Sequence, residues 1–252
     1  SSTNESFDIQ LSASDSAISH AIDSLISTSP IAKARKRKAL HVPAGLDGAD
    51  QVLLEMYDHP FPLKVTSLYV RPPFQSYPTR LLEKIGVSEK VIRRKNLAFE
   101  GYASGRFQFF EMLPKSTIRR LINLDPSDGQ RFYPANFTAE DVNEHLDNLI
   151  FILQEYNNFN LYLTDAPIPF ALVMYEIASS SVPEYFTAFF QSYSSAEARD
   201  LGCFVLQDPY VYQSIAENIV HWISTHESTI RDRKKVIAFL KGVKQELNSK
   251  QK

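Results

Sequence analysis

Histidine, cysteine and carboxylate side chains are the first candidates for chemistry, because they supply most metal ligands and acid–base groups in proteins. The six histidines are His20, His41, His59, His145, His221 and His226. Glu217 and His221 stand four residues apart and could share a helix face, while Glu144 and Asp147 flank His145. A metal centre needs three or four converging ligands. These loose pairs therefore favour ordinary surface or core histidines over a metal or catalytic site.

The single cysteine, Cys203, stands in an apolar stretch, so we expect a packed small hydrophobe and not a nucleophile. One cysteine forms no disulfide within the chain, and no secretory signal is present, which together favour a reducing, cytoplasmic compartment. The sequence contains no phosphate loop, dinucleotide fingerprint, nucleophile elbow or zinc–cysteine pattern. We expect no catalytic residues, no metal and no cofactor, with an unrecognised enzyme as an alternative.

One segment, residues 81–95, has the pattern of a helix–turn–helix, with a turn followed by a second helix that Ser88 would cap. The residues that could face phosphate or base edges are Lys90, Arg93 and Arg94. Leu82 occupies a position where a small residue is usual, and Lys95 one where an apolar residue is usual. Direct DNA binding through a helix–turn–helix at 79–98 is thus one hypothesis, and a helix pair with a solvated basic face is the other.

A second group of residues could line a ligand pocket, because such sites combine aromatic walls with a few oriented polar groups. These residues stand at or beside predicted strands and are Tyr69, Arg71, Arg106, Glu111, Tyr162 and Tyr175. For each of them, taken singly, an ordinary half-buried position in a sheet is the favoured interpretation. The sequence predicts a ligand site only if the fold brings them together.

The bulk composition is that of a folded protein, with 44% hydrophobic and 12% aromatic residues. The formal net charge of −2 argues against a protein that coats nucleic acid by bulk attraction, although a local basic patch stays possible. No run approaches 18 apolar residues, so we expect no membrane span.

The first 60 residues differ in composition from the remainder. Ten serines lie among the first 29 residues, where the apolar spacing predicts a short amphipathic helix at 15–27. The basic run 33–38 fits a linker or solvated helix end, with phosphate contact or targeting as alternatives. Residues 41–61 suggest loop, helical turn and loop. We predict a leader at 1–60 and a globular domain at 61–252.

The globular part mixes strands and helices without the regular alternation of a doubly wound sheet, which favours an α+β fold with a mixed or antiparallel sheet flanked by amphipathic helices. Strands are predicted at 63–70, 107–113, 159–163, 170–177 and 202–206, and helices at 79–102 with a break at Gly86, from Pro114, and at 138–156, 183–192, 209–225 and 228–247. Thr138 and Asp141 form a near capping box at the clearest helix. Strands 159–163 and 170–177, joined through two prolines, are expected to pair antiparallel.

The stretch from Thr138 to Phe170 carries a resemblance. Its capped helix with Leu146–Leu149, then Phe159–Asp165, then Pro167, is similar to the C-terminal effector or sensor region that follows the helix–turn–helix domain in bacterial XRE-type transcriptional regulators. The resemblance implies a DNA-binding domain upstream of Ser1, and it makes segment 81–95 part of the sensor fold.

The preferred hypothesis is therefore a non-catalytic regulatory domain that binds an effector or partner and adjusts an attached DNA-binding module. The effector would be an unknown small molecule or protein, DNA would be contacted through the upstream domain, and a homodimer is possible. A protein–protein interaction scaffold is a further alternative, because the sequence is rich in aromatic residues and has amphipathic helices at both ends.

Overall fold

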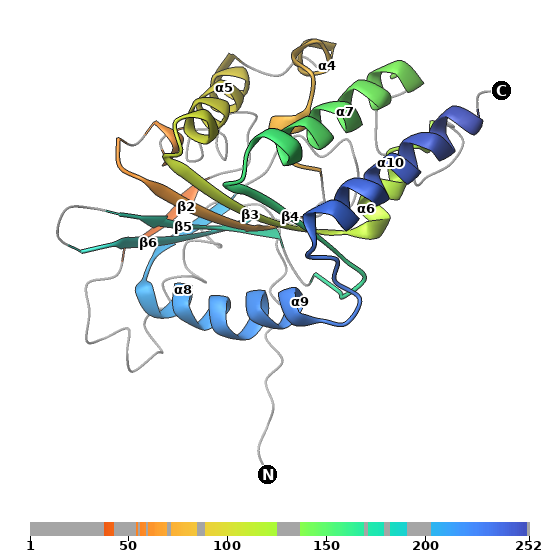
Figure 1. Ribbon diagram of the computed structural model, residues 1–252. Coiled ribbons are helices and arrows are strands. Elements are labelled where there is room, and N and C mark those ends of the chain that lie inside the picture. Colours follow the sequence, from red (N-terminus) through yellow and green to blue (C-terminus); the bar gives the residue numbers. More distant parts are fainter. Residues whose placement is uncertain are drawn as a thin grey trace.

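A seven-stranded mixed sheet forms the centre of the computed structural model (Figure 1), and it confirms the predicted α+β class. The described residues are 38–42, 54, 56–58, 60–69, 72–84, 89–124, 137–168, 171–178, 182–190 and 203–250. The predicted helix at 15–27, most of the basic run 33–38 and Arg71 lie outside them. None of the described helices is long and apolar enough to cross a membrane.

The order of the strands in the sheet is β1-β7-β6-β5-β2-β3-β4. Their bounds are β1 Lys38–Val42, β2 Leu63–Leu68, β3 Phe107–Pro114, β4 Phe159–Thr164, β5 Ala171–Ile177, β6 Glu184–Phe190 and β7 Cys203–Gln207. Strands β2, β3 and β4 run parallel, whereas β5 pairs antiparallel with β2 and begins the antiparallel half. The sheet therefore changes from parallel to antiparallel pairing between β2 and β5.

Helices cover both faces of this sheet (Figure 1). On the first face, here called the α7 face, lie η1 Phe74–Ser76, α4 Thr79–Lys84, α5 Glu89–Ala103, α6 Lys115–Arg120, α7 Ala139–Glu155 and α10 Arg233–Ser249. On the other, the α8 face, lie α8 Pro209–Ile215, the π-helix η2 Ala216–Val220 and α9 His221–Thr225. The predicted helix at 209–225 is confirmed as these three consecutive segments.

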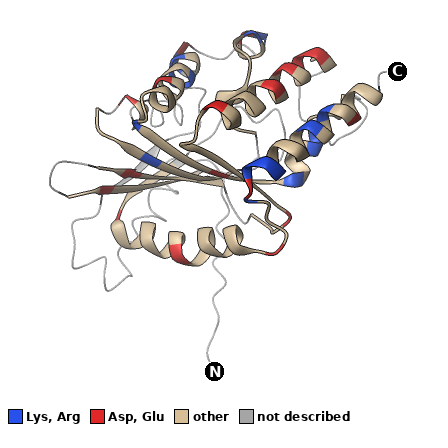
Figure 2. Ribbon diagram, viewed as in Figure 1, with Lys and Arg blue, Asp and Glu red and all other residues tan. Residues whose placement is uncertain are grey.

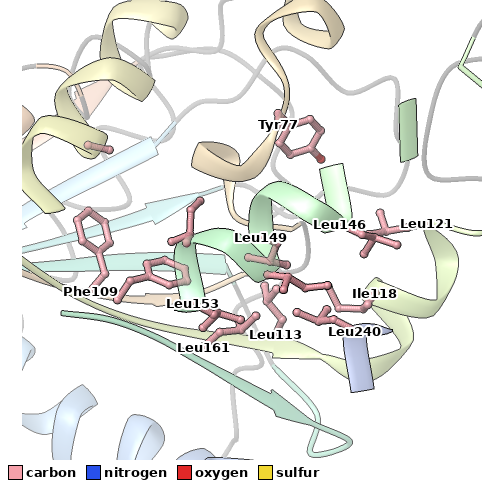
Figure 3. Packing of buried hydrophobic residues seen from close by; sticks show 14 of the residues in the cluster. Tyr77, Phe109, Leu113, Ile118, Leu121, Leu146, Leu149, Leu153, Leu161 and Leu240 are labelled. Carbon is pink, nitrogen blue, oxygen red and sulfur yellow. The ribbon is translucent and has the colours of Figure 1, made fainter. Parts of the chain in front are cut away.

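The main core lies between the sheet and α7, where aliphatic side chains from several elements meet (Figure 3). Leu149 and Leu153 of α7 pack with Leu113 of β3, Leu161 of β4 and Leu240 of α10, all of them buried. Burial of each such side chain contributes about 1.5–3 kcal/mol. This packing holds α7 and α10 side by side across β4.

The predicted N-terminus of α7 is confirmed in detail. The Thr138 hydroxyl accepts from the Asp141 backbone N–H at 3.2 Å, and the Asp141 carboxylate accepts from the Thr138 N–H at 2.9 Å. Such a reciprocal box satisfies two of the four amides that have no partner within a helix. Local sequence thus determines where this helix begins.

The predicted pairing of residues 159–163 with 170–177 is wrong, because β3 and β2 lie between β4 and β5. Strand β5 is apolar on both faces, with Leu172 and Met174 on one side and Val173 and Tyr175 on the other. A strand buried on both faces belongs in the middle of a sheet. In the observed sheet β5 pairs with β2 on one side and β6 on the other, and β4 forms the edge of the sheet.

The predicted helix at 183–192 is also wrong, because Glu184–Phe190 is strand β6. Phe186 packs toward the α7 face and Phe189 toward the α8 face, so both sides of the strand are apolar and the alternation typical of a surface strand is lost. Seven residue pairs join it to β5. This long-range pairing overrides the helical spacing of the phenylalanines.

Two smaller differences concern the ends of the described chain. Strand Lys38–Val42, predicted as linker and loop, pairs with β7 at the sheet edge. The last helix starts at Arg233 instead of 228, because Asp232 caps it by accepting from the Lys235 N–H at 2.9 Å. Ile230 instead exchanges backbone hydrogen bonds with Leu163 of β4.

Candidate ligand-binding site

Polar side chains gather on the α7 face over β2 and β3, near the ends at which these parallel strands leave the sheet. Ser67 of β2 and Glu111 of β3 are direct partners in the register, so their side chains stand side by side. Gln75 of η1 follows β2, and its Nε2 donates to Glu111 Oε1 at 3.5 Å. The fold therefore brings polar side chains from β2, β3 and η1 together on one face of the sheet.

Two residues of α5 and one that precedes β2 complete this group. We call Tyr57, Ser67, Gln75, Arg94, Tyr102 and Glu111 the polar cluster, and all six are buried. The charges of Arg94 and Glu111 both act on the pKa of Tyr57, and Glu111 also acts on that of Tyr102. These mutual effects place the charged and hydroxyl groups close together.

Glu111 is the only carboxylate of the polar cluster, and its environment changes its charge. Burial raises the pKa of Glu111 to about 8, although the Gln75 amide and the Arg94 guanidinium act to lower it. Desolvation disfavours the charged carboxylate more than these partners favour it. At neutral pH the carboxyl is therefore mostly protonated and can donate a hydrogen bond.

Aromatic rings form the walls around the polar cluster. The Tyr57 ring lies 5.8 Å from Phe109 and 6.4 Å from Tyr175 in edge-on geometry. The Tyr102 ring lies 4.8 Å from Phe109 and 5.5 Å from Phe159, also edge-on. Such edge-on pairs fix the positions of the rings but supply no hydrogen bond to the tyrosine hydroxyls.

Three polar atoms of the cluster are buried without a hydrogen bond. Among the described residues, none forms a hydrogen bond of good geometry with the Tyr102 hydroxyl, Ser67 Oγ or Gln75 Oε1, although the Gln75 side chain lies close enough to the Tyr102 hydroxyl to act on its pKa. A buried polar group left unpaired costs about 1–3 kcal/mol, and native proteins contain few of them. Three such atoms in one place indicate a site that water or a ligand completes.

A second buried polar group, Ser76 and His145, lies on the same face under η1. Ser76 Oγ donates to the Pro73 carbonyl at 2.6 Å and lies 2.6 Å from His145 Nε2. Because the hydroxyl has one proton, His145 must carry its proton on Nε2 and donate to the serine. Burial lowers the pKa of His145 to about 3, and the positive charge of Lys95 adds to this.

This Ser76–His145 pair does not have the arrangement of a nucleophilic dyad. In such a dyad the histidine accepts the serine proton, whereas here the proton points at the Pro73 carbonyl. The Tyr77 ring covers the imidazole at a centroid distance of 4.1 Å. The pair instead fixes η1 on α7, which holds the neighbouring Gln75 in place.

Of the six residues predicted to line a ligand pocket, Arg71 lies outside the described residues, and the other five divide between both faces. Glu111 belongs to the polar cluster, and Tyr175 and Tyr69 lie on the same face, where Tyr69 acts on the pKa of Tyr57. Arg106 stacks on Phe107 at 4.2 Å and donates to the Tyr57 carbonyl at 3.3 Å. Tyr162 packs on the α8 face, away from the others.

The predicted DNA-reading residues stand on α5, which with α4 forms the expected helix pair. Lys90 is exposed, and Arg93 is exposed and paired with Asp58 at 3.0 Å. Arg94 is buried in the polar cluster. Only two of the three side chains therefore reach solvent.

The residues considered for metal or catalytic chemistry are scattered. Glu217 and His221 lie on the α8 face, where Gln213 Nε2 donates to Glu217 at 2.6 Å, and His145 lies on the α7 face. Cys203 begins β7, but its side chain falls outside the described ones. In the described part of the chain, no three His, Cys, Asp or Glu side chains are grouped to hold a metal ion.

Sequence reasoning missed most members of the polar cluster. Tyr57, Gln75 and Tyr102 lie in a short turn, a 3-10 helix and a helix end, each without a motif. The one usable signal was Glu111, a carboxylate in an otherwise apolar strand. Such a residue is either paired or functional once the strand is buried.

Comparisons with known proteins give little that bears on this site. No protein-family model matches. No curated protein matches either. A structural similarity is found to TrmBL2, an archaeal chromatin protein, with a TM-score of 0.37 and 12% sequence identity over 84% of this chain. The match covers 60% of the TrmBL2 chain.

Proposed function

We propose that the polar cluster binds a small polar effector and that the domain is the regulatory, non-catalytic part of a transcriptional regulator. The observation that carries the proposal is the set of three buried polar atoms without a partner among the described residues, beside a carboxyl that burial keeps protonated. The resemblance of residues 138–170 to the sensor region of XRE-type regulators supports the regulatory part.

The chemistry of the cluster favours an uncharged ligand with hydrogen-bond donors and acceptors close together. The protonated Glu111 and the hydroxyls of Tyr102 and Ser67 can donate, and Gln75 Oε1 can accept. A ligand that pairs all four groups removes several desolvation penalties at once. An apolar ligand would leave these groups unpaired and is disfavoured.

Access to the cluster requires a movement. Tyr57 and Gln75 cover the site and are only 6% and 4% exposed. A ligand therefore favours a state in which the segment around Tyr57 or η1 has shifted, and it changes the population of that state by its differential affinity. This gives an effector a physical means to influence an attached module.

The proposal is tested by a thermal-shift screen of uncharged polar metabolites on the full chain. A ligand at about 100 times its Kd stabilises the folded state by about 2.7 kcal/mol. We expect the shift to disappear in Tyr102→Phe and to weaken in Glu111→Gln, and to persist in the matched control Tyr162→Phe on the α8 face. A ligand whose shift survives both cluster substitutions would place its site elsewhere and reject the proposal.

A further inference from the structure

Basic residues are concentrated along α6 and α10 (Figure 2). The basic strip comprises Arg119 and Arg120 of α6, Arg231 before α10, and Lys234, Lys235 and Lys241 of α10, and all six are exposed. The two helices are in contact, with the Arg119 guanidinium 5.6 Å above the Phe239 ring. The strip is thus made of basic residues from two distant parts of the chain that the fold brings into contact.

Helix geometry aims part of the strip straight at solvent. The buried stripe of α10 consists of Val236, Leu240, Val243 and Leu247. Lys234 and Lys241 lie almost opposite this stripe at 100° per residue, and their seven-residue separation corresponds to about 10 Å along the helix. That length corresponds to about three spacings between successive phosphates of one DNA strand, which follow every 3.4 Å or so along the axis.

Other cations nearby are already engaged within the chain. Lys244 pairs with Asp147 at 2.5 Å, and Lys115 pairs with Asp165 at 2.7 Å. Arg233 donates to four backbone carbonyls between residues 153 and 159. By contrast, Arg119, Arg231, Lys234, Lys235 and Lys241 form no ion pair with any described residue.

The basic residues at the start of α10 are not explained by helix stability. Arg233, Lys234 and Lys235 occupy its first turn, where the positive end of the helix dipole disfavours cations. Asp232, the cap, is the acidic group beside them. In α7 the first turn carries Glu140 and Asp141, the favourable arrangement. The basic residues of the strip therefore destabilise the first turn of α10.

The acidic surface of α7 does not make a second copy of this chain a good partner. Glu144 is paired with Arg80, Asp141 with Lys84, and Asp147 with Lys244. Most of that negative charge is thus already neutralised within the molecule. The α7 surface of a second copy is therefore a poor source of the anion that would complement the strip.

The surroundings of the strip also disfavour a lipid surface or a hydrophobic protein contact. The large exposed hydrophobic residues of the described chain are Phe61, Phe151, Val182, Tyr210 and Trp222, and none lies on α6 or α10. Amphipathic membrane binding and protein hot spots both need apolar anchors next to the cations. A polyphosphate backbone needs only positive charge and reach.

We propose that the basic strip binds the phosphate backbone of double-stranded DNA without reading its sequence. This contact is separate from the effector site and differs from a helix–turn–helix at 79–98, because it uses neither Lys90 nor Arg93. If four side chains neutralise phosphates, the affinity should fall about 100-fold between about 50 and 200 mM salt, since the slope of log K against log salt is about −0.9 per phosphate.

The test is fluorescence anisotropy of the full chain with a labelled duplex of arbitrary sequence and about 20 base pairs, titrated across that salt range. We expect the double variant Lys234→Ala/Lys241→Ala to bind DNA about 10-fold more weakly, or weaker still, at low salt. The slope of log K against log salt should become smaller by about two. The double variant Lys90→Ala/Arg93→Ala removes the same charge from α5 and should leave both values nearly unchanged. Circular dichroism checks that both variants stay folded.

Three outcomes would overturn the proposal. The first is no DNA binding by the unmodified chain at the lowest salt concentration. The second is a loss of affinity in the α5 variant that equals or exceeds the loss in the α10 variant, which would return the contact to the helix–turn–helix. The third is binding to phosphatidylserine vesicles in the absence of DNA binding, which would identify a lipid surface as the partner.

Discussion

Replacing Tyr102 by phenylalanine should make the protein more stable, which is the opposite of what most core substitutions do. The hydroxyl is buried, and the Gln75 side chain beside it forms no hydrogen bond of good geometry with it. Phenylalanine keeps the ring and its edge-on contacts with Phe109 and Phe159 at 4.8 and 5.5 Å. The substitution therefore removes only the oxygen atom that has no partner.

The expected gain follows from the cost of that oxygen. A buried unpaired polar group costs about 1–3 kcal/mol, and part of this is offset by the denatured state. We expect a gain of about 1 kcal/mol in the free energy of unfolding. For a domain of this size, that corresponds to a rise of about 2–4 °C in Tm.

Urea denaturation at constant pH, with thermal unfolding as a second probe, measures this gain. A shift of the urea midpoint without a change in m-value shows that the stability itself has changed. Tyr162→Phe is the matched control, because that tyrosine is half-buried on the α8 face, and its effect should stay within about 0.5 kcal/mol. A loss of stability in Tyr102→Phe would refute the reasoning, because it would show that the hydroxyl is hydrogen-bonded without a ligand.

Three further predictions concern titration and packing. The pKa of Glu111 is raised from 4.5 to about 8, so between these two pH values the folded state binds a proton that the unfolded state has released. The free energy of unfolding should therefore fall as the pH rises from 4.5 to 8, by at most about 1.4 kcal/mol per pH unit. In Glu111→Gln the urea midpoint should no longer fall with pH above about pH 7. The pKa of His145 is lowered from 6.5 to about 3, so the free energy of unfolding should fall as the pH falls from 6.5 to 3. In His145→Gln the urea midpoint should depend less on pH in this acidic range. Gly101→Ala would place a Cβ 1.8 Å from the Phe107 ring and should cost about 3 kcal/mol in thermal unfolding, whereas Gly242→Ala, with nothing within 4 Å, should gain up to about 1 kcal/mol.

The two titrations have opposite signs, and this decides how the protein responds to pH. Between the unfolded values of 4.5 and 6.5, Glu111 holds one extra proton in the folded state and His145 holds one fewer. The two slopes cancel there and leave stability nearly flat. Of these two groups, only Glu111 contributes above that range and only His145 below it, where Asp141, whose pKa is lowered mainly through its bonds to Lys84 and Thr138, adds a loss of stability of the same sign. A steep change between pH 5 and 6 would show that at least one of the two assignments is wrong.

Local signals in the sequence were enough for several elements. Thr138 and Asp141 mark the start of α7, and Asp208-Pro209 marks that of α8, because a side chain within three residues satisfies the free amides of the first turn. Strands 63–68 and 107–114 were also predictable, since their apolar and β-branched residues are bounded by proline. In each case the deciding interaction lies within a few residues along the chain.

Pairing across the sheet could not be predicted in the same way. The order β5-β2-β3-β4 depends on contacts between residues far apart along the chain, 44 positions for Leu63 with Phe107 and 104 for Leu68 with Leu172. For β6, the spacing of Phe186 and Phe189 fits a helix and a two-sided strand equally well. Only the burial of both faces distinguishes these possibilities, and burial depends on which strands are neighbours.

The candidate site was even harder to predict, because none of its residues taken alone belongs to a recognisable motif. Arg94 was assigned to an exposed DNA-reading face together with Arg93, yet the two successive residues project about 100° apart around α5, and Arg94 is buried in the polar cluster. Which side of a helix faces inward is decided by the strands beneath it, here β2 and β3 with Ser67 and Glu111. A carboxylate in an apolar strand and an arginine on the helix above it become one site only when the fold joins them. The useful signal in such a sequence is therefore the charged residue that breaks an apolar pattern, since its burial must be compensated by some partner.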